Sequence, residues 1–212
     1  MVQVKKGDLV RIEYTGKLAS NGSIFETTDG NLARDIGIFQ EKNSYGPKLA
    51  AFGTNTIMVG LEEAILSSTL GKEEEFSIVP EKAFGEKSQD MVRMMPMRDF
   101  VRQQVQPVPG RILMLDGVAA KVKSVSAGRV VVDFNHPLAG ESVRYNLKVN
   151  EVISEPEEKI KALLLSLAVK GDVSKNGKGF VVSFPKTEDA VRVQAAKNAI
   201  DVIVPGTKYQ SS

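Results

Sequence analysis

The stretch DFNHPLAGESVRYNLKV, residues 133–149, lies where the chain returns from one folding unit to another. Its first half is rich in the residues typical of turns, and its second half begins a strand predicted over residues 143–153. Upstream, from about Glu86, the composition changes to a Met-rich segment (90–101) and then a Pro-rich one (106–110). These changes indicate a domain boundary on each side of the intervening segment.

The intervening segment is predicted to be a small β-rich domain. Three short strand-like runs follow the Pro-rich residues: RILML, VAAKVKSV and RVVVDF. Asp116-Gly117 and Ala127-Gly128 separate these runs, and both dipeptides are typical of tight hairpins. We therefore predict an inserted domain over residues 87–136, within a host domain made of residues 1–86 and 137–154.

The host domain begins with a strand that alternates in polarity. Val10, Ile12 and Tyr14 fall on one face of residues 8–14, and charged residues fall on the other. Asn21-Gly22 predicts a hairpin, and Ile24 begins the returning strand. Residues 27–56 are weakly periodic and are predicted to be a loop and one strand that ends near Ile57. A short amphipathic helix (LEEAILSS) follows Gly60, and a strand over KEEEFSI follows the helix.

The C-terminal residues 155–212 are predicted to form a third domain with the order α-β-α-β. Ser154 and Glu157 have the spacing of a capping box, with Pro156 in the first turn of the helix. A strand (FVVSF), a helix over about 188–199 and a short strand (DVIVP) follow. The first helix has leucines over more than one stripe, which suggests burial on two sides and a homodimer formed through this domain.

Composition excludes several classes of site. A net charge of +2 gives no electrostatic case for binding nucleic acid or an anionic membrane surface. The chain has no cysteine and one histidine, His136, so thiol catalysis and a Cys- or His-rich metal site are excluded and no metal or cofactor is expected. No signal peptide and no membrane-spanning run are expected, so the sequence predicts a cytoplasmic protein.

Four short motifs in order resemble those of FKBP-type peptidyl-prolyl cis/trans isomerases. They are EYTGKL followed by IFETT, TIMVGLEEAI, AFGEK, and DFNHPLAGESVRYNLKV. The last resembles the signature of SlyD-like members, in which a chaperone domain is inserted in the flap of the isomerase domain. The C-terminal segment resembles the extra domain of long archaeal FKBPs. The resemblance implies an α+β fold: an FKBP-like antiparallel β half-barrel with a short helix, an inserted β-rich domain and a C-terminal α/β domain.

The resemblance also implies roles for individual residues. It places an apolar proline-binding pocket among aromatic and aliphatic side chains, with Glu26 as the polar neighbour of Tyr14 and the Met58 backbone N–H as donor to a substrate carbonyl. The pocket residues implied as catalytic are Tyr14, Phe25, Glu26, Met58, Phe84 and Tyr145, and those implied as substrate-binding are Ile57 and Leu61. The alternative is that these aromatic residues are only the core of a small β-barrel.

The Met-rich segment is predicted to bind unfolded polypeptides. Methionine is flexible and polarizable, so a surface of such side chains adapts to many sequences. The residues proposed for this surface are Met91, Met94, Met95, Met97 and Phe100. Methionine is also an ordinary core residue, so burial in the inserted domain is the alternative.

These features predict an enzyme that isomerises Xaa-Pro bonds of unfolded or nascent polypeptides and also acts as a chaperone. Rotation about such a bond breaks no covalent bond, so an apolar, water-poor pocket with a few fixed hydrogen-bond donors is sufficient. Two alternatives remain. One is a chaperone or assembly module with weak or no isomerase activity, and the other is a β-barrel interaction protein with chance motifs.

Overall fold

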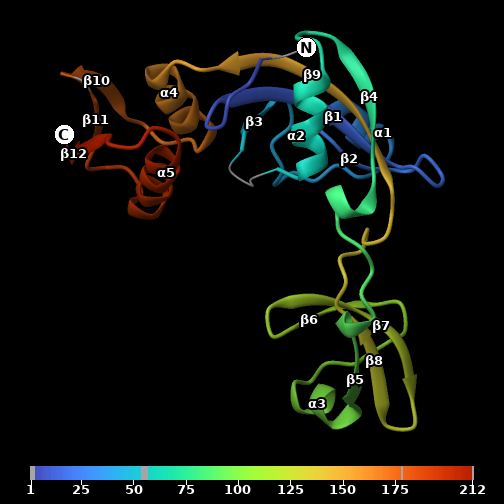
Figure 1. The fold of residues 1–212 in the computed structure, drawn as a ribbon. Helices are drawn as coiled ribbons and strands as arrows, with labels where there is room; N and C mark the ends of the chain where they lie inside the picture. Colours follow the sequence, from blue (N-terminus) through green and yellow to red (C-terminus); the bar gives the residue numbers. More distant parts are fainter. Residues whose placement is uncertain (1–2, 54–56, 178, 212) are drawn as a thin grey trace. The chain divides into compact units, whose positions relative to one another are not determined.

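The structure is a computed structural model that describes residues 3–53, 57–177 and 179–211. It divides into two compact units, one formed by Met1–Val79 with Ser142–Ser212 and the other by Pro80–Glu141. Figure 1 labels the elements of both units. The segment predicted as an insertion, residues 87–136, lies within the second unit.

The first unit contains a five-stranded antiparallel sheet with the strand order β2-β1-β9-β4 and with β3 also paired to β1. Its longest pairing joins β1 and β9, with a bulge between Arg11 and Ile12. The strands are β1 (Leu9–Leu18), β2 (Ile24–Thr27), β3 (Lys48–Ala51), β4 (Glu73–Ile78) and β9 (Val143–Ile153). All pairs of strands in this sheet are antiparallel, as the resemblance to FKBP-type isomerases implies.

Alternation along these strands explains the core on one face of the sheet. Val10 and Ile12 of β1 are buried with Leu147 and Val149 of β9. Helix α2 (Val59–Ser67) adds Ala64 and Ile65 to this cluster. The predicted strand alternation and the short helix after Gly60 are therefore both present in the structure.

The region 27–56 differs from the expectation of a loop and one strand. A short helix, α1 (Gly30–Asp35), begins after Asp29, whose carboxylate accepts the backbone N–H groups of Asn31 and Leu32. The strand of this region, β3, ends at Ala51 and not near Ile57, while residues 54–56 lie outside the described residues. With six residues and one buried side chain, α1 is too short to show a helical period.

The C-terminal segment has the order α-β-β-α-β, so the predicted α-β-α-β order is wrong. Its elements are α4 (Pro156–Ser166), β10 (Asp172–Asn176), β11 (Gly179–Phe184), α5 (Ala190–Ile203) and β12 (Lys208–Ser211). Strand β11 is central, antiparallel to β10 and parallel to β12. The run DVIVP, predicted as a strand, instead supplies the end of α5. Ile200 and Val204 are both buried at helical spacing, and such a short apolar run does not distinguish helix from strand.

The C-terminal segment shares a core with the sheet of the first unit. Leu9 and Ile153 pack with Ile160, Leu163 and further buried residues of α4, β11 and α5. The predicted capping box is also wrong, because the residue that caps α4 is Glu155 and it makes no side-chain capping bond. The Ser154 side chain instead helps to lower the pKa of the buried Asp8 carboxyl group.

The second unit is a four-stranded antiparallel sheet, in the order β5-β8-β7-β6, with one helix. Asp116-Gly117 and Ala127-Gly128 have positive φ angles at both residues, as tight hairpins require. Strand β5, within the Met-rich segment, was not predicted. The elements are the 3₁₀ turns η1 (Pro80–Lys82) and η2 (Gln89–Met91), β5 (Val92–Pro96), α3 (Met97–Arg102), β6 (Ile112–Leu115), β7 (Val118–Ser126) and β8 (Arg129–Asp133).

Candidate functional site

Three aromatic rings from three strands gather at one end of the first unit's sheet. The ring centres of Tyr14 and Phe25 lie 5.8 and 6.0 Å from that of Tyr145. Gly16, opposite Tyr145 in the sheet, makes room for these rings, since a Cβ atom there would lie 2.8 Å from Phe25. The glycine of the EYTGKL motif is thus explained by close packing of the aromatic cluster.

Glu26 is the polar member of this cluster. Its carboxylate accepts a hydrogen bond from the Tyr145 hydroxyl, so its partner is Tyr145 and not the Tyr14 suggested by the resemblance. Burial raises the pKa of Glu26, and the bond from Tyr145 opposes that rise. Burial, and then the Glu26 charge, raise the pKa of Tyr14 to about 12 and raise that of Tyr145 as well. Both tyrosines therefore keep their hydroxyl protons at neutral pH.

A cavity of about 660 Å³ opens beside the cluster. Strands β1 and β2 form one wall with Tyr14, Phe25, Glu26 and Thr27. The segment 38–48 forms the other wall with Ile38, Gln40, Lys42, Asn43, Ser44, Tyr45 and Lys48. We call this the aromatic cavity; its strand wall offers two aromatic rings beside a carboxylate.

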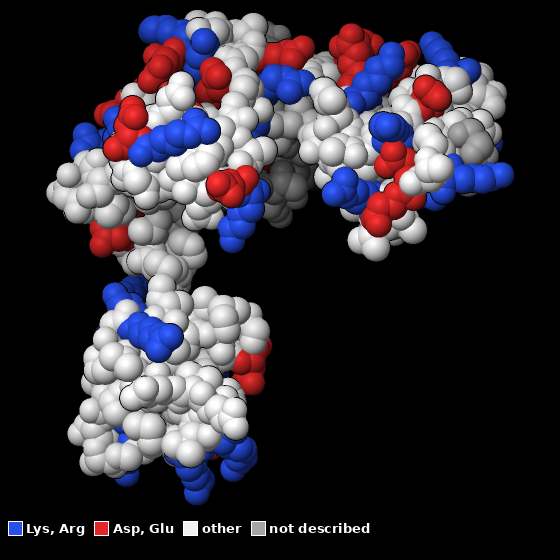
Figure 2. All heavy atoms as spheres, turned by 180° about the vertical axis from the view of Figure 1, so that it is seen from behind, with Lys and Arg blue, Asp and Glu red and all other residues white. Residues whose placement is uncertain are grey.

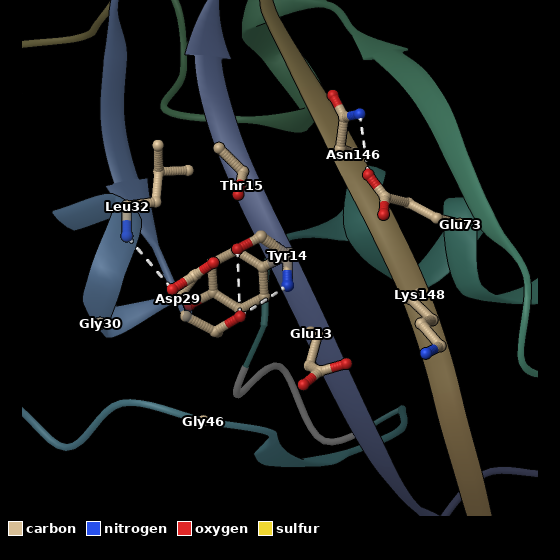
Figure 3. A pocket seen from close by; sticks show the side chains of 11 residues that line it. Glu13, Tyr14, Thr15, Asp29, Gly30, Leu32, Gly46, Glu73, Asn146 and Lys148 are labelled. Atoms are coloured by element: carbon tan, nitrogen blue, oxygen red, sulfur yellow. Dashed lines mark hydrogen bonds between the residues drawn. The ribbon is translucent and has the colours of Figure 1, made fainter. Parts of the chain in front are cut away.

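A second cavity, of about 460 Å³, has a different character. Figure 3 shows the carboxylates of Glu13 and Glu73, the amide of Asn146 and the ammonium of Lys148 around it, and Asn146 donates a hydrogen bond to Glu73. Tyr14 lines both cavities, whereas Glu13 lines only this one. Of the other residues that line it, only Leu32 has a large apolar side chain, so this cavity offers a prolyl ring one aromatic side chain and not two on its strand wall.

Other pocket residues of the sequence prediction lie near the cluster but contribute differently. Ile57 and Tyr14 pack against the same core, and Leu61 is buried at the start of α2. Tyr145 is 0% exposed, so it supports the cluster from within and does not line its surface as predicted. No described residue accepts a hydrogen bond from the Met58 N–H, although the Met58 carbonyl accepts from Leu61 and Glu62.

Phe84 belongs to the second unit. Its ring stacks on that of His136, with centres 4.5 Å apart and planes 2° from parallel. The Leu138 N–H donates to Nδ1 of His136, which holds the turn before β9. The role of Phe84 at the rim of a proline pocket stays a prediction.

The predicted methionine surface is partly wrong. Phe100 is 1% exposed at the centre of the second unit's core, and Met95 and Met97 pack against that core. These three side chains point inward because β5 alternates and α3 covers the sheet. Met91 and Met94 are exposed as expected.

The structure adds apolar residues to this surface that the sequence analysis did not select. Ile112 and Met114 of β6 are exposed, and with Met94 on β5 they lie on the face opposite the core. Figure 2 shows a face of the unit that contains β5–β8 with few charged side chains. The alternation within RILML could have indicated this surface, because the exposed residues Ile112 and Met114 alternate with the buried residues Leu113 and Leu115.

The second wall of the aromatic cavity was also missed. Lys42, Tyr45 and Lys48 lie in a region of weak periodicity, and no motif of the sequence singled them out. Within residues 3–53, 57–177 and 179–211, no three or more His, Cys, Asp or Glu side chains gather closely enough to hold a metal ion. None of the helices in that part of the chain is long and apolar enough to span a membrane.

Comparisons with known proteins show which proteins this chain is similar to. Residues 2–101 match the family model described as FKBP-type peptidyl-prolyl cis-trans isomerase, and residues 93–138 match that of the FKBP26 IF domain. The chain is 30% identical over 149 residues to the short-type peptidyl-prolyl cis-trans isomerase of Methanocaldococcus jannaschii, an alignment covering 70% of this chain and 94% of that protein.

Two bacterial relatives are similar as well. The FKBP-type 16 kDa peptidyl-prolyl cis-trans isomerase of Escherichia coli is 29% identical over 154 residues, covering 70% of this chain and 93% of the relative. The isomerase SlyD of Helicobacter pylori is 34% identical over 113 residues, covering 52% and 61% respectively. The chain therefore belongs to the family of FKBP-type peptidyl-prolyl cis-trans isomerases.

Proposed function

We propose that this chain isomerises Xaa-Pro bonds of unfolded polypeptides in the aromatic cavity. The observation that supports this site most strongly is the clustering of Tyr14, Phe25 and Tyr145 around Glu26 beside a cavity large enough for a peptide segment. The second cavity shares Tyr14 but has neither Phe25 nor Glu26 in its lining.

Isomerisation requires the peptide to pass through a twisted amide that has lost its resonance. The uncatalysed barrier is about 18–20 kcal/mol. Apolar walls favour the twisted amide because it is less polar than the planar one and loses less by leaving water. The prolyl ring would pack against Tyr14 and Phe25, and the Met58 N–H would donate to a neighbouring carbonyl of the peptide. Leu61 and Tyr145 would support these groups from the core.

The second unit is proposed to hold unfolded chains as an inserted chaperone domain. Its exposed apolar side chains on β5 and β6 support this role, since they lie on one face of the sheet and can accept varied apolar segments. A client held there would have its prolyl bonds at raised local concentration near the first unit. The three-domain division and the cytoplasmic location expected from the sequence stay predictions.

The function is tested with two assays on the full chain: isomerisation of a short proline peptide and refolding of a protein limited by prolyl isomerisation. Phe25→Ala is expected to lower kcat/KM about tenfold in both assays, because an apolar contact in the cavity is lost. Glu13→Gln, in the second cavity, is the control and is expected to leave kcat/KM unchanged in both assays. Equal effects of the two substitutions would contradict the assignment of the site.

Replacing residues 87–136 with a short loop separates the two proposed activities. Turnover of the short peptide is expected to persist, while catalysis of protein refolding falls about a hundredfold as the local concentration of client is lost. If the unchanged chain suppresses aggregation of an unfolded protein but accelerates neither reaction, it is a holdase chaperone and the isomerase assignment is wrong.

The C-terminal segment is proposed to join two copies of the chain. Val191, Ala195, Asn198 and Val202 lie along one face of α5 and are exposed, which gives a largely apolar stripe three turns long. A helix face of this kind is suited to packing against the same face of a second copy. Removing the whole segment is a poor test, because it would uncover Leu9 of β1.

Light scattering provides the measurement of oligomeric state. The unchanged chain is expected to have the mass of a dimer, and Val191→Glu combined with Val202→Glu is expected to give a monomer. Leu70→Glu, at an exposed apolar residue outside the stripe, is the control and should leave the dimer intact. A monomer mass for the unchanged chain would contradict the dimer.

A further inference from the structure

The two walls of the aromatic cavity differ in charge. The strand wall has one ionisable carboxyl group, Glu26, whose carboxylate accepts the Tyr145 hydroxyl. The wall formed by residues 38–48 contributes two ammonium groups, Lys42 and Lys48, together with the polar side chains of Gln40, Asn43 and Ser44. Glu41, between these residues in sequence, is exposed and does not line the cavity.

The cationic wall is held in place by a stack of side chains. The Tyr45 and Phe39 rings lie 4.9 Å apart and 12° from parallel, and the Arg34 guanidinium lies 4.0 Å from the centre of the Phe39 ring. The Gln40 N–H donates to the Tyr45 hydroxyl at 3.0 Å. A Cβ atom at Gly30 would lie 3.2 Å from that of Tyr45, so α1 also packs closely against this wall. A wall built in this way is formed before a ligand arrives.

The ammonium groups of Lys42 and Lys48 form no ion pair among the described residues. The Lys48 ammonium donates to the carbonyl and the hydroxyl of Ser44, both neutral acceptors. Neither Lys42 nor Lys48 has a carboxylate partner in the part of the chain that the structure describes. An anionic group that enters the cavity would therefore meet two cations that form no ion pair among the described residues, and one carboxylate, Glu26, on the opposite wall.

On the basis of the proposed function, we infer that Lys42 and Lys48 select Xaa-Pro bonds that are flanked by an acidic residue. The prolyl ring packs on the strand wall with Tyr14 and Phe25, while the carboxylate of a neighbouring Asp or Glu faces the lysines across the cavity. A neighbouring Lys or Arg is disfavoured by the same charges. The lysines are specificity-determining residues and take no part in twisting the amide.

The test compares three peptides that differ only in the residue before proline: Glu, Gln or Lys. The unchanged chain is expected to turn over the Glu peptide about fivefold faster than the Lys peptide in kcat/KM at low ionic strength, since an exposed charge pair is worth up to about 1 kcal/mol. At 1 M salt the ratio is expected to approach one, because the Debye length falls to about 3 Å.

Charge reversal identifies the residues responsible. Lys42→Glu with Lys48→Glu is expected to invert the Glu/Lys preference, measured as the ratio of the two kcat/KM values within the same variant. Lys42→Glu alone, which breaks no hydrogen bond among the described residues, is expected to remove most of the preference. Lys175→Glu with Lys186→Glu, both in the C-terminal segment, changes the net charge equally and is expected to leave the preference intact.

The outcomes separate this inference from the proposed function. Equal turnover of all three peptides by the unchanged chain, or equal preferences in the cavity variant and the C-terminal control, would overturn the selection of acidic residues while the isomerase assignment stands. If none of the peptides is turned over, the isomerase function fails and the inference falls with it.

Discussion

Phe100→Ala is expected to unfold the unit Pro80–Glu141 while the first unit stays folded. Phe100 is 1% exposed among Leu113, Val122, Val130 and other buried residues, so its loss leaves a cavity in a small core. Truncation of a buried phenylalanine costs about 3–5 kcal/mol. A domain of about 60 residues has a stability of the same order, since folded proteins have about 0.05–0.15 kcal/mol per residue.

The functional consequence distinguishes core residues from client-binding residues. The Phe100→Ala variant is expected to lose catalysis of refolding and suppression of aggregation. The loss should be about as large as in the variant whose residues 87–136 are replaced by a short loop, and turnover of a short peptide should persist in both. Met94→Ala is the control, because Met94 is 62% exposed and its truncation should leave the unfolding transition unchanged. It is expected to weaken client binding by a few-fold only.

Hydrogen exchange resolved by segment measures which unit has opened. Fast exchange confined to residues 80–141 of Phe100→Ala is the expected result. Slow exchange throughout this unit, combined with lost client binding, would instead show that Phe100 contacts clients directly, and its assignment to the core would be wrong.

Lys159→Met is expected to destabilise the first unit by about 3–5 kcal/mol, because it leaves a buried carboxylate without its partner. The Lys159 ammonium donates to Oδ1 of Asp8 at 2.9 Å, and both residues are buried between α4 and the start of β1. Lys5 donates its backbone N–H to the other oxygen of Asp8. The pair lies beside the core that the C-terminal segment shares with Leu9, so its loss is expected to loosen the packing of α4 on the sheet.

The effect depends on pH in a defined direction. Burial alone would raise the pKa of Asp8, but the hydrogen bonds from Lys5 and Lys159 and the Lys159 charge lower it overall. A carboxyl group whose pKa is lowered by folding stabilises the folded state above its unfolded value and loses this contribution as the pH falls through the folded value. The difference between the unchanged chain and Lys159→Met is therefore expected to be largest above about pH 5 and to shrink below about pH 4.

Denaturant unfolding at several pH values measures this difference. Lys161→Met, which removes the exposed partner of Glu157 one turn along α4, is the control and should cost less than about 0.5 kcal/mol. Asp8→Asn with Lys159→Met is expected to recover a large part of the loss, since no buried charge then lacks a partner. Equal destabilisation by Lys159→Met and Lys161→Met would contradict the buried pair.

Much of the fold followed from local patterns in the sequence. Alternation at Val10, Ile12 and Tyr14 predicted β1, and Asp116-Gly117 and Ala127-Gly128 predicted the hairpins of the second unit. These signals are reliable because the side-chain period of a strand and the φ angles of a tight turn restrict which residues are suitable. The end of α5 and the residue that caps α4 were predicted wrongly. A short apolar run fits either a helix or a strand, and neighbouring residues compete for the capping position.

The sequence by itself determined the family, through the order of four motifs, and the strands that bring Tyr14, Phe25 and Tyr145 together. Only the tertiary structure decided that Tyr145 binds Glu26, that Phe100 is core while Met94 is surface, and that Lys42 and Lys48 face the aromatic strands across a cavity. The physical reason is that each of these depends on contacts between residues distant in sequence. Local periodicity shows which residues share a face of one element, but it does not show which other element that face meets.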